Sequence, residues 1–196
     1  DTKVYRATLS LGKSTDTYDA SGKILEEKEV GQISKAQVID VYGVLNHVLL
    51  AKHFKTLMMY IGKDVQVIDQ VTGQKRSACL ADESHCAIII SYSGQTREMV
   101  EVAEIYHKRN IPFISITCMA ENSISRLADV HLYLSSREML HIKIGDFAST
   151  TSLKYLFDIL YAGVFSHDYK KNLETKIVVA SYVDDRQSED EYINEK

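Results

Sequence analysis

The sequence predicts an α/β fold in which a five-stranded parallel sheet is flanked by helices on both faces. Two observations lead to this prediction. Short apolar stretches alternate with longer amphipathic stretches along most of the 196-residue chain, and strands separated by helices form right-handed βαβ units that build a parallel sheet. In addition, residues 86–90 (CAIII) form a continuous apolar run, which is typical of a strand that is covered on both faces.

The first half of the predicted sheet consists of two strands, each followed by a helix. Residues 38–44 (VIDVYGV) form a short apolar stretch, which indicates the first strand. Residues 47–61 place apolar side chains at helical spacing, and Gly62 supplies a stop for that helix. The second strand is expected over residues 65–68, and a short helix over residues 72–80.

The second half continues the same alternation. The third strand is the apolar run 86–90, and residues 97–108 follow it as an amphipathic helix with its apolar side chains on one side. Residues 112–117 (PFISIT) are expected to form the fourth strand. A short helix is expected over residues 123–128, and the fifth strand over residues 130–134.

The two ends of the chain differ from this alternating region. Residues 147–165 are apolar with few charges, so this helix is expected to be buried or packed against a partner. The start of the chain is polar and interrupted by glycines, with a short helix expected near residues 24–29. The predicted organisation is a polar lead-in or linker over residues 1–30, one domain over residues 31–172, and a C-terminal extension over residues 173–196 with an acidic, solvated tail.

Composition and charge exclude several classes of protein. The net charge is −4, and no run of lysine and arginine is longer than two residues. A domain that grips DNA or RNA phosphates shows a clustered basic surface, so this segment is not expected to contact nucleic acid. No apolar run approaches the roughly 18 residues of a membrane span, and no signal peptide is visible. The chain begins at Asp1 without an initiator methionine, which we interpret as a segment of a longer protein.

The cysteines and histidines indicate a reducing compartment without a metal site. Cys79, Cys86 and Cys118 are odd in number and form no CxxC pair, which favours free, buried thiols over a disulfide or metal role. The histidines show no metal-ligand spacing, and HExxH is absent. We therefore predict a cytoplasmic protein that uses no metal and no other cofactor.

One loop has the position and the residue types of a ligand site. In an open parallel sheet, ligands bind beyond the carboxyl ends of the strands. The third predicted strand is followed directly by the sequence SYSGQT and then by a predicted helix. The free N–H groups and the positive dipole end of a helix start attract an anion. The candidate binding residues of this loop are Ser91, Ser93, Gly94, Gln95 and Thr96.

The side chains of this loop suit a phosphate group. The hydroxyls of Ser91, Ser93 and Thr96 can each donate a hydrogen bond to a phosphate oxygen, and Gly94 lets the backbone turn tightly. The alternative is that Thr96 or Ser93 caps the following helix, although a capped helix start is also an anion site. The chain contains neither GxGxxG nor GxxxxGK followed by Ser or Thr, which disfavours a dinucleotide-binding fold and a nucleoside triphosphatase.

The order of these motifs resembles the sugar isomerase (SIS) domain. Within that superfamily, the chain is most similar to the C-terminal effector domain of RpiR-family bacterial transcription regulators. The similarity runs from about Lys35 to Asn172, and SYSGQT is its most specific piece. The matching pieces, in chain order, read VIDVYGV, YIGK, ISYSGQT, PFISIT, LAD, FAS and LFDILYAGVFS.

The resemblance implies a SIS-type, flavodoxin-like sandwich that binds a phosphorylated sugar and forms a homodimer or a higher homo-oligomer. In such regulators a separate N-terminal helix-turn-helix domain contacts DNA, and that domain is absent from this chain. The predicted function is therefore a phosphosugar-binding effector domain of a sugar-responsive transcription regulator. Two alternatives stay open: a free-standing phosphosugar aldose–ketose isomerase, and a SIS-like scaffold with little ligand affinity.

The sequence departs from the family at one turn. SIS domains usually carry Gly-x-Gly-x-Ser after the first strand, with both glycines and the serine close to the ligand. Here the second glycine is replaced by Leu45 and the serine by His47. A leucine at this position would narrow the pocket, whereas the histidine brings a longer, titratable donor. Gly43, Asn46 and His47 are candidate phosphosugar contacts, and a surface or packing role is the alternative for the last two.

Two further polar residues lie near the predicted strand ends. In SIS isomerases a glutamate after the fifth strand moves a proton between two sugar carbons, with a nearby acid. Glu138 stands in this region and would be catalytic only in an isomerase, with His141 or His47 as the acid. In an effector domain it is a solvated charge, or it pairs with Arg137 or a partner subunit. Ser149 either donates to the phosphosugar or caps the last predicted helix.

Overall fold

The structure, a computed structural model, describes residues 13–15, 24–27, 36–118, 121–134, 138–139 and 145–183. Its centre is a five-stranded parallel sheet with the strand order β4-β3-β5-β6-β7. The strands are β3 (Val38–Tyr42), β4 (Asp64–Ile68), β5 (His85–Ile90), β6 (Phe113–Thr117) and β7 (Val130–Tyr133). Because β4 lies on one side of β3 and β5 on the other, the winding direction reverses between β3 and β5, and such a reversal is where open α/β sheets bind ligands.

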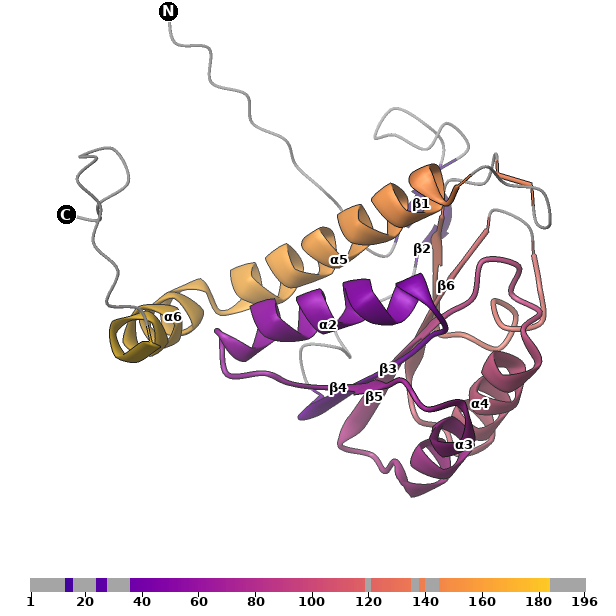
Figure 1. The fold of residues 1–196 in the computed structure, drawn as a ribbon, viewed down its shortest axis with the longest axis horizontal. Coiled ribbons are helices and arrows are strands. Elements are labelled where there is room, and N and C mark those ends of the chain that lie inside the picture. The colour runs from indigo at the N-terminus through magenta and orange to yellow at the C-terminus, as the bar shows by residue number, and fades with distance from the viewer. Residues whose placement is uncertain are drawn as a thin grey trace, which may run out of the picture.

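Helices cover both faces of this sheet, as predicted (Figure 1). Helices α2 (Asn46–Met59) and α5 (Phe147–His167) lie on one face. Helices α3 (Val71–Leu80) and α4 (Arg97–Lys108) lie on the other. Every helix within 36–118 and 145–183 is too short or too polar to cross a lipid bilayer.

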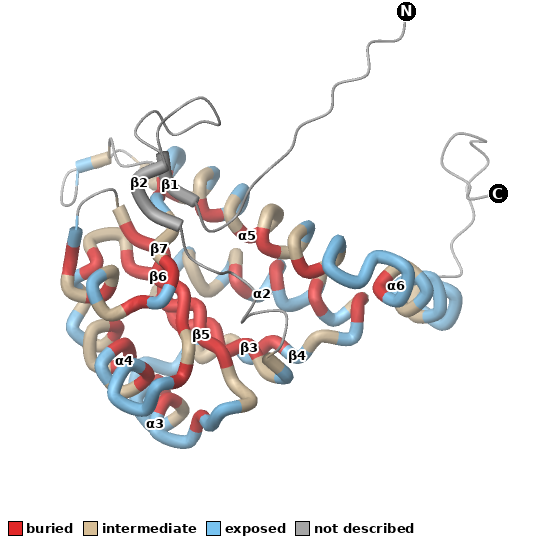
Figure 2. Tube along the Cα trace, turned by 180° about the vertical axis from the view of Figure 1, so that it is seen from behind, coloured by how far each residue is buried: buried red, intermediate tan, exposed pale blue. Residues whose placement is uncertain are grey.

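Two apolar layers hold the sheet between its helices, and the buried residues in Figure 2 follow these layers. In the first layer, the ring of Phe54 in α2 stacks on Phe157 in α5 with centroids 4.7 Å apart. In the second, Tyr106 of α4 meets Phe113 of β6 edge to face at 6.4 Å. Side chains of β5 from Cys86 to Ile90 alternate between the two layers, which explains why this run is apolar at every position.

The five predicted strands and four of the predicted helices are confirmed, with ends that differ by a few residues. The first strand stops at Tyr42 because the chain turns at Gly43 and α2 begins at Asn46. Helix α2 ends before Gly62, whose φ of 69° suits glycine. The amide N–H of Lys63 then bonds back to the carbonyl of Met58 at 3.0 Å, so the predicted glycine stop is present.

The prediction of a short helix over residues 123–128 is wrong, because residues 123–127 form turns. The side chain of Asn122 explains the difference. Its Oδ1 accepts the amide N–H groups of Ile124 at 3.2 Å and Ser125 at 3.0 Å. An asparagine that takes up backbone donors in this way offers the chain an alternative to the helical ladder.

The short helix expected near residues 24–29 is also wrong. Strand β2 (Ile24–Glu27) pairs antiparallel with strand β1 (Lys13–Thr15) in a separate two-stranded sheet. A four-residue stretch is too short to hold a helix by itself, whereas a neighbouring strand satisfies its backbone groups. The rest of the predicted polar lead-in lies outside the described residues.

A helix that the sequence analysis did not predict, α6 (Tyr169–Val183), follows α5. It buries only Asn172, whose Nδ2 donates to the carbonyls of Val164 and Phe165 at 3.1 and 3.0 Å. Because its apolar residues do not gather on one buried face, their periodicity is weak. The predicted domain boundary at residue 172 stays a prediction, and the acidic tail beyond 183 lies outside the described residues.

The three cysteines are free thiols, as expected, but only one of them is buried. Cys86 lies in β5, and burial raises the pKa of its thiol to about 12. Cys118 is half-buried after β6, and Cys79 is exposed near the end of α3. The prediction that all three are buried is therefore correct only for Cys86. Cys79 departs furthest from it, because that residue lies on the solvent side of an amphipathic helix.

Candidate functional site

The loops after β3 and β5 leave the sheet side by side at its carboxyl edge. Tyr42, the last residue of β3, is paired in register with Ile89 of β5. A Cβ on Gly43 would lie 3.0 Å from the Cβ of His47 and 3.7 Å from that of Ile90. The structure thus brings Gly43 and His47 against the end of β5, where residues 91–96 begin. We refer to residues 91–96 as the 91–96 loop.

The 91–96 loop is shaped from inside by Ser91. This residue is only 1% exposed, and its Oγ lies 2.8 Å from Oγ1 of Thr96. The amide N–H of Gly94 bonds to both oxygens of Ser91, at 3.1 Å to the carbonyl and 3.2 Å to the hydroxyl. Gly94 itself has a φ of 64°, a backbone conformation that favours glycine. The buried Ser91 side chain therefore fixes the shape of the loop from its interior side.

Within residues 36–118, no side chain caps the start of helix α4. Thr96 occupies the N-cap position, but its side chain makes no capping hydrogen bond because it is turned toward Ser91. The predicted alternative, in which Thr96 or Ser93 caps this helix, is therefore absent. The N–H groups of a first helical turn have no partner within the helix, so this turn can accept an anion.

Ser93 and Gln95 take different positions in the loop. The Ser93 hydroxyl accepts the amide N–H of Gln95 at 3.2 Å, so its own hydrogen is left to donate to another acceptor. The Gln95 side chain turns away, because its Oε1 accepts the hydroxyl of Ser123 at 2.8 Å. Ser93 is thus the loop hydroxyl best placed for an outside acceptor.

The carboxylate of Glu138 caps helix α5. It accepts the amide N–H groups of Ala148 at 2.6 Å and Ser149 at 2.9 Å, and its second oxygen accepts the Ser149 hydroxyl at 2.6 Å. Tyr92 of the 91–96 loop donates its hydroxyl to the Glu138 carbonyl at 2.8 Å. Of the two roles predicted for Ser149, the structure shows it at the start of α5 with its hydroxyl bonded to Glu138. Arg137 and His141 lie outside the described residues.

Asn46 joins the starts of α2 and α5. Its Nδ2 donates to Oδ2 of Asp146 at 2.5 Å, and the same oxygen accepts the hydroxyl of Thr150 at 2.9 Å. This bridge closes one side of the carboxyl edge. Every predicted phosphosugar contact therefore lies at this edge. Five of them use their side chains for hydrogen bonds within the protein: Ser91, Gln95, Thr96, Asn46 and Ser149.

Asn122 is a residue of this edge that the sequence analysis did not single out. It is 2% exposed and lies directly against Gly94. The signal in the sequence is weak, because asparagine before a serine starts many turns. Only the fold brings it beneath the 91–96 loop.

Leu45 retains a glycine-like backbone. Its φ of 53° and ψ of −122° fall in a region that a side chain with a Cβ rarely adopts. The side chain is 86% exposed, so burial does not offset the strain. Leucine therefore holds a turn shape that suits glycine better, at a cost of roughly 1–3 kcal/mol.

We expect Leu45→Gly to stabilise the protein by about 1 kcal/mol. The relief of strain exceeds the roughly 0.5–1 kcal/mol that glycine loses through the flexibility of the unfolded chain. Urea denaturation measures the change. Leu49→Gly is the matched control, because Leu49 is also exposed but lies within α2, where glycine costs about 1 kcal/mol. Loss of stability in both variants would contradict strain at Leu45.

A shallow depression at the opposite edge of the sheet is a poorer anion site. It is lined by Asp82, Glu83, Arg109, Asn110 and Ile111. The Arg109 guanidinium donates to backbone carbonyls of α3, while two carboxylates stand at the rim. The two carboxylates would repel an anion there, and the Arg109 guanidinium that could bind it is already hydrogen-bonded to the backbone.

The family model for the SIS domain matches residues 32–156. The chain belongs to the SIS domain family. The resemblance of the sequence is thereby confirmed, together with the parallel sheet that it implied.

Relatives of this SIS domain include transcription regulators. It is 26% identical over 155 residues to an uncharacterised HTH-type transcriptional regulator, YbbH, of Bacillus subtilis, covering 79% of this chain and 55% of the relative. The structure of the Vibrio vulnificus NanR protein complexed with ManNAc-6P matches with a TM-score of 0.72, 23% identity, and coverage of 79% of this chain and 58% of that chain. The sugar isomerase domain of an RpiR transcription factor from Sphaerobacter thermophilus matches with a TM-score of 0.65, 18% identity, and coverage of 78% and 83%. At these identities the two structural matches concern the fold.

Proposed function

We propose that this SIS domain is the phosphosugar-binding effector domain of a sugar-responsive transcription regulator. The observation that carries the proposal is the start of α4, where the Thr96 side chain makes no capping hydrogen bond and the preceding loop holds a Ser93 hydroxyl that can donate outward. A phosphate placed there would accept N–H groups of the first helical turn and the Ser93 hydroxyl. The NanR structure, whose bound molecule is a sugar phosphate, supports the same ligand class.

The remaining contacts divide between the phosphate and the sugar. We assign Ser93, Gly94, Gln95 and Thr96 to the phosphate end, with Ser91 shaping the loop. The N–H groups of Gly94 and Gln95 already bond to Ser91 and Ser93, so these two residues would border the phosphate without donating to it. The sugar would extend toward the turn after β3 and the start of α5, because these border the loop. The contacts assigned to that end are Gly43, Asn46, His47 and Ser149.

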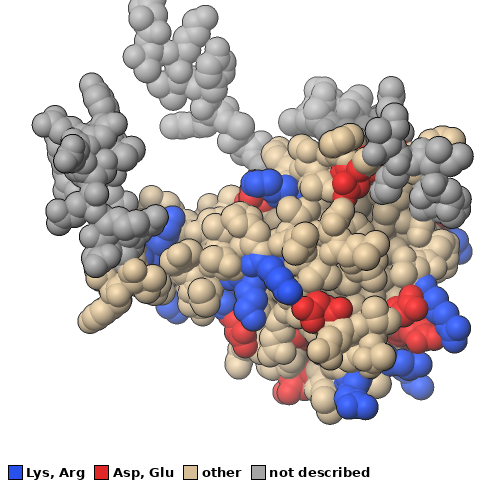
Figure 3. Space-filling view, viewed as in Figure 1, with Lys and Arg blue, Asp and Glu red and all other residues tan. Residues whose placement is uncertain are grey.

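We assign DNA binding to another part of the regulator. The chain spans 55% of the length of the Bacillus relative, and its net charge is −4. On the face shown in Figure 3, lysine and arginine side chains alternate with aspartate and glutamate instead of forming one basic patch. We further propose residues 31–172 as the sensing domain and the cytoplasm as its location, since a bacterial regulator acts where the chromosome is.

A homodimer is part of the proposal. Large apolar side chains are exposed along the last two described helices, among them Tyr155 of α5 and Ile177, Val178 and Tyr182 of α6. Exposed apolar surface of this kind favours association. Sedimentation velocity of the chain tests for the homodimer. A chain that stays monomeric at all concentrations would rule the homodimer out.

An isomerase is the second candidate, and Glu138 argues against it. A general base must reach the sugar carbon, but this carboxylate already accepts three hydrogen bonds at the start of α5. We therefore propose binding without turnover. Conversion of an aldose phosphate to its ketose, abolished by Glu138→Gln, would overturn this part of the proposal.

We expect one sugar phosphate, and not its parent sugar, to raise the melting temperature of the chain. A ligand that binds only the folded state stabilises it by RT ln(1 + [L]/Kd), about 2.7 kcal/mol at 100 Kd. Ser93→Ala removes a hydrogen bond to a charged group, so we expect the affinity to fall roughly tenfold or more. A thermal-shift panel of phosphorylated and unphosphorylated sugars measures both effects.

Ser166→Ala is the control for this experiment, because Ser166 is exposed at the far end of α5. Its melting temperatures should follow those of the wild type with every sugar. An equal shift with the parent sugar, or an unchanged shift in Ser93→Ala, would argue against a phosphate in the 91–96 loop.

A further inference from the structure

Asn122 lies against the tightest point of the 91–96 loop. A Cβ placed on Gly94 would come within 2.0 Å of the Asn122 Oδ1, 2.1 Å of its Cγ and 2.6 Å of its Nδ2. The whole amide plane of Asn122 therefore faces the Cα of Gly94. Space at this point is sufficient for a hydrogen atom on the loop and for nothing larger.

The amide of Asn122 cannot retreat without losing hydrogen bonds. Its Nδ2 donates to Oγ1 of Thr117 at 2.7 Å, and its Oδ1 accepts two backbone N–H groups from Ile124 and Ser125. The backbone N–H of Asn122 is also used, since it donates to the Ser125 hydroxyl at 2.9 Å. At 2% exposure this side chain is a fixed support.

The hydrogen bonds that hold Asn122 extend to the neighbouring strand at the end of the sheet. Oγ1 of Thr117, the last residue of β6, lies 2.6 Å from Nε2 of His131 on β7. Two further bonds tie the loop to the same region: the amide N–H of Cys118 donates to the Tyr92 carbonyl at 2.9 Å, and Ser123 donates to Gln95. The end of β6 and the turn after it thus contact the loop at Tyr92, Gly94 and Gln95.

We infer that Asn122 is the positioning residue of the 91–96 loop. It acts through Gly94 and the turn at 122–125, and it holds the loop in the shape that carries the Ser93 hydroxyl and leads into the start of α4. An anion site made of backbone N–H groups works only if their directions are fixed before the ligand arrives. The inference rests on the proposed phosphate site, although the state of the loop can be measured without ligand.

The test compares Asn122→Ala with Asn172→Ala. Both residues are buried asparagines, at 2% and 4% exposure, but Asn172 bonds to carbonyls of α5, away from the loop. We expect Asn122→Ala to speed hydrogen–deuterium exchange of peptides covering 91–96 at least tenfold, and to weaken binding of inorganic phosphate by a similar factor. Asn172→Ala should lower the melting temperature while both loop readouts stay at wild-type values.

Two further variants keep the test decisive. Asn122→Asp has the same shape and keeps the acceptor for the turn but loses the Nδ2 donor to Thr117, so exchange of the 91–96 loop should lie between that of Asn122→Ala and that of the wild type. If Asn122→Ala does not fold, Thr117→Val replaces it, because valine removes the partner of Nδ2 and we expect a smaller rise in the same exchange.

The outcomes separate this inference from the proposed function. Unchanged loop exchange in Asn122→Ala, or an equal rise in Asn172→Ala, would overturn the role of Asn122. A wild-type chain that binds neither inorganic phosphate nor any sugar phosphate would overturn the proposed function instead. In that case, the exchange comparison still decides whether Asn122 positions the loop.

Discussion

Replacing Gly94 with alanine should lower the free energy of unfolding by about 3 kcal/mol or more, and should abolish phosphate binding. The φ of 64° costs about 1 kcal/mol once a Cβ is present. The larger part comes from overlap, since that Cβ would lie 2.0 Å from Oδ1 of Asn122. Asn122 can move only by giving up buried hydrogen bonds, and a buried polar group left unsatisfied costs about 1–3 kcal/mol. Urea denaturation and a phosphate titration measure the two effects.

Gly73→Ala is the matched control for this variant. Gly73 lies within α3, and its nearest neighbour to an added Cβ is Gln70 at an ordinary 3.7 Å. Alanine is the better helix former, so this change should stabilise the protein by up to about 1 kcal/mol. The double variant Gly94→Ala/Asn122→Gly should recover part of the loss, because the overlap is gone. A Gly94→Ala protein as stable as the wild type would contradict the packing of the loop.

Features that repeat along the chain could be predicted from the sequence. Strand β5 is apolar at nearly every position because it is covered on both faces. Helix α2 ends where Gly62 permits a positive φ. The position of the 91–96 loop could be predicted from the alternation of strands and helices, because open parallel sheets bind ligands at their carboxyl edge.

Features that depend on distant partners could not be predicted. Strand β2 forms because β1 pairs with it, and its four residues carry no period of their own. The turn at 123–127 depends on the side chain of Asn122, which outcompetes the helix expected there. Glu138 caps a helix that begins nine residues later. Its role therefore depends on the three-dimensional path of the chain, which brings the start of α5 next to Glu138.

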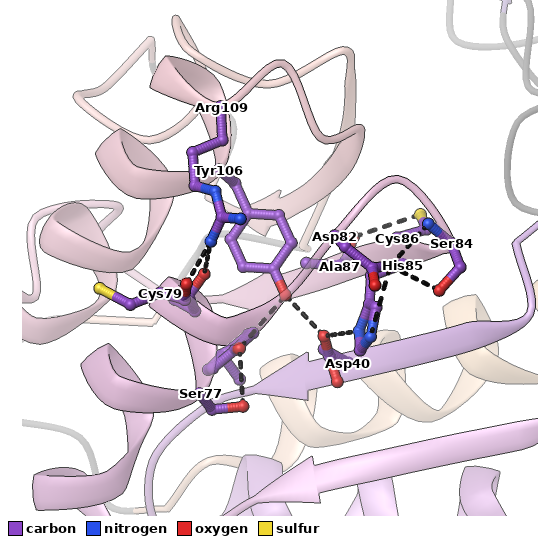
Figure 4. Close-up of polar contacts among 12 residues, drawn as sticks. Asp40, Ser77, Cys79, Asp82, Ser84, His85, Cys86, Ala87, Tyr106 and Arg109 are labelled. Carbon is purple, nitrogen blue, oxygen red and sulfur yellow. Dashed lines mark hydrogen bonds and ion pairs between the residues drawn. The ribbon is translucent and has the colours of Figure 1, made fainter.

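A buried polar network between the sheet and helices α3 and α4 was not predicted either (Figure 4). Asp40 of β3 is 1% exposed, and its Oδ2 accepts Nδ1 of His85 at 2.7 Å and the hydroxyl of Tyr106 at 2.6 Å. The hydroxyls of Tyr106 and Tyr42 lie 3.2 Å apart, and Tyr42 donates to Ser77 of α3. This network links β3, β5, α3 and α4.

Burial keeps both phenols of this network protonated. It raises the pKa of Tyr42 from 10.0 to about 12 and also raises the pKa of Tyr106. Tyr106 is therefore a donor at neutral pH, and the Asp40 carboxyl group is its acceptor. Hydrogen bonds to a buried carboxyl group are stronger than those in water, but each depends on the others being made.

Asp40→Ala should consequently lower the free energy of unfolding by about 3 kcal/mol, as measured by urea denaturation. The change leaves the buried Tyr106 hydroxyl without its short acceptor, removes the hydrogen-bond partner of His85 Nδ1, and opens a void between β3 and α4. Asp40→Asn has the same size and keeps an oxygen for Tyr106, so roughly half of the loss is expected. Asp64→Ala, on the exposed side of the edge strand β4, is the control and should change stability by less than about 0.5 kcal/mol. Equal losses for Asp40→Ala and Asp64→Ala would mean that the network contributes no more to stability than an exposed charge.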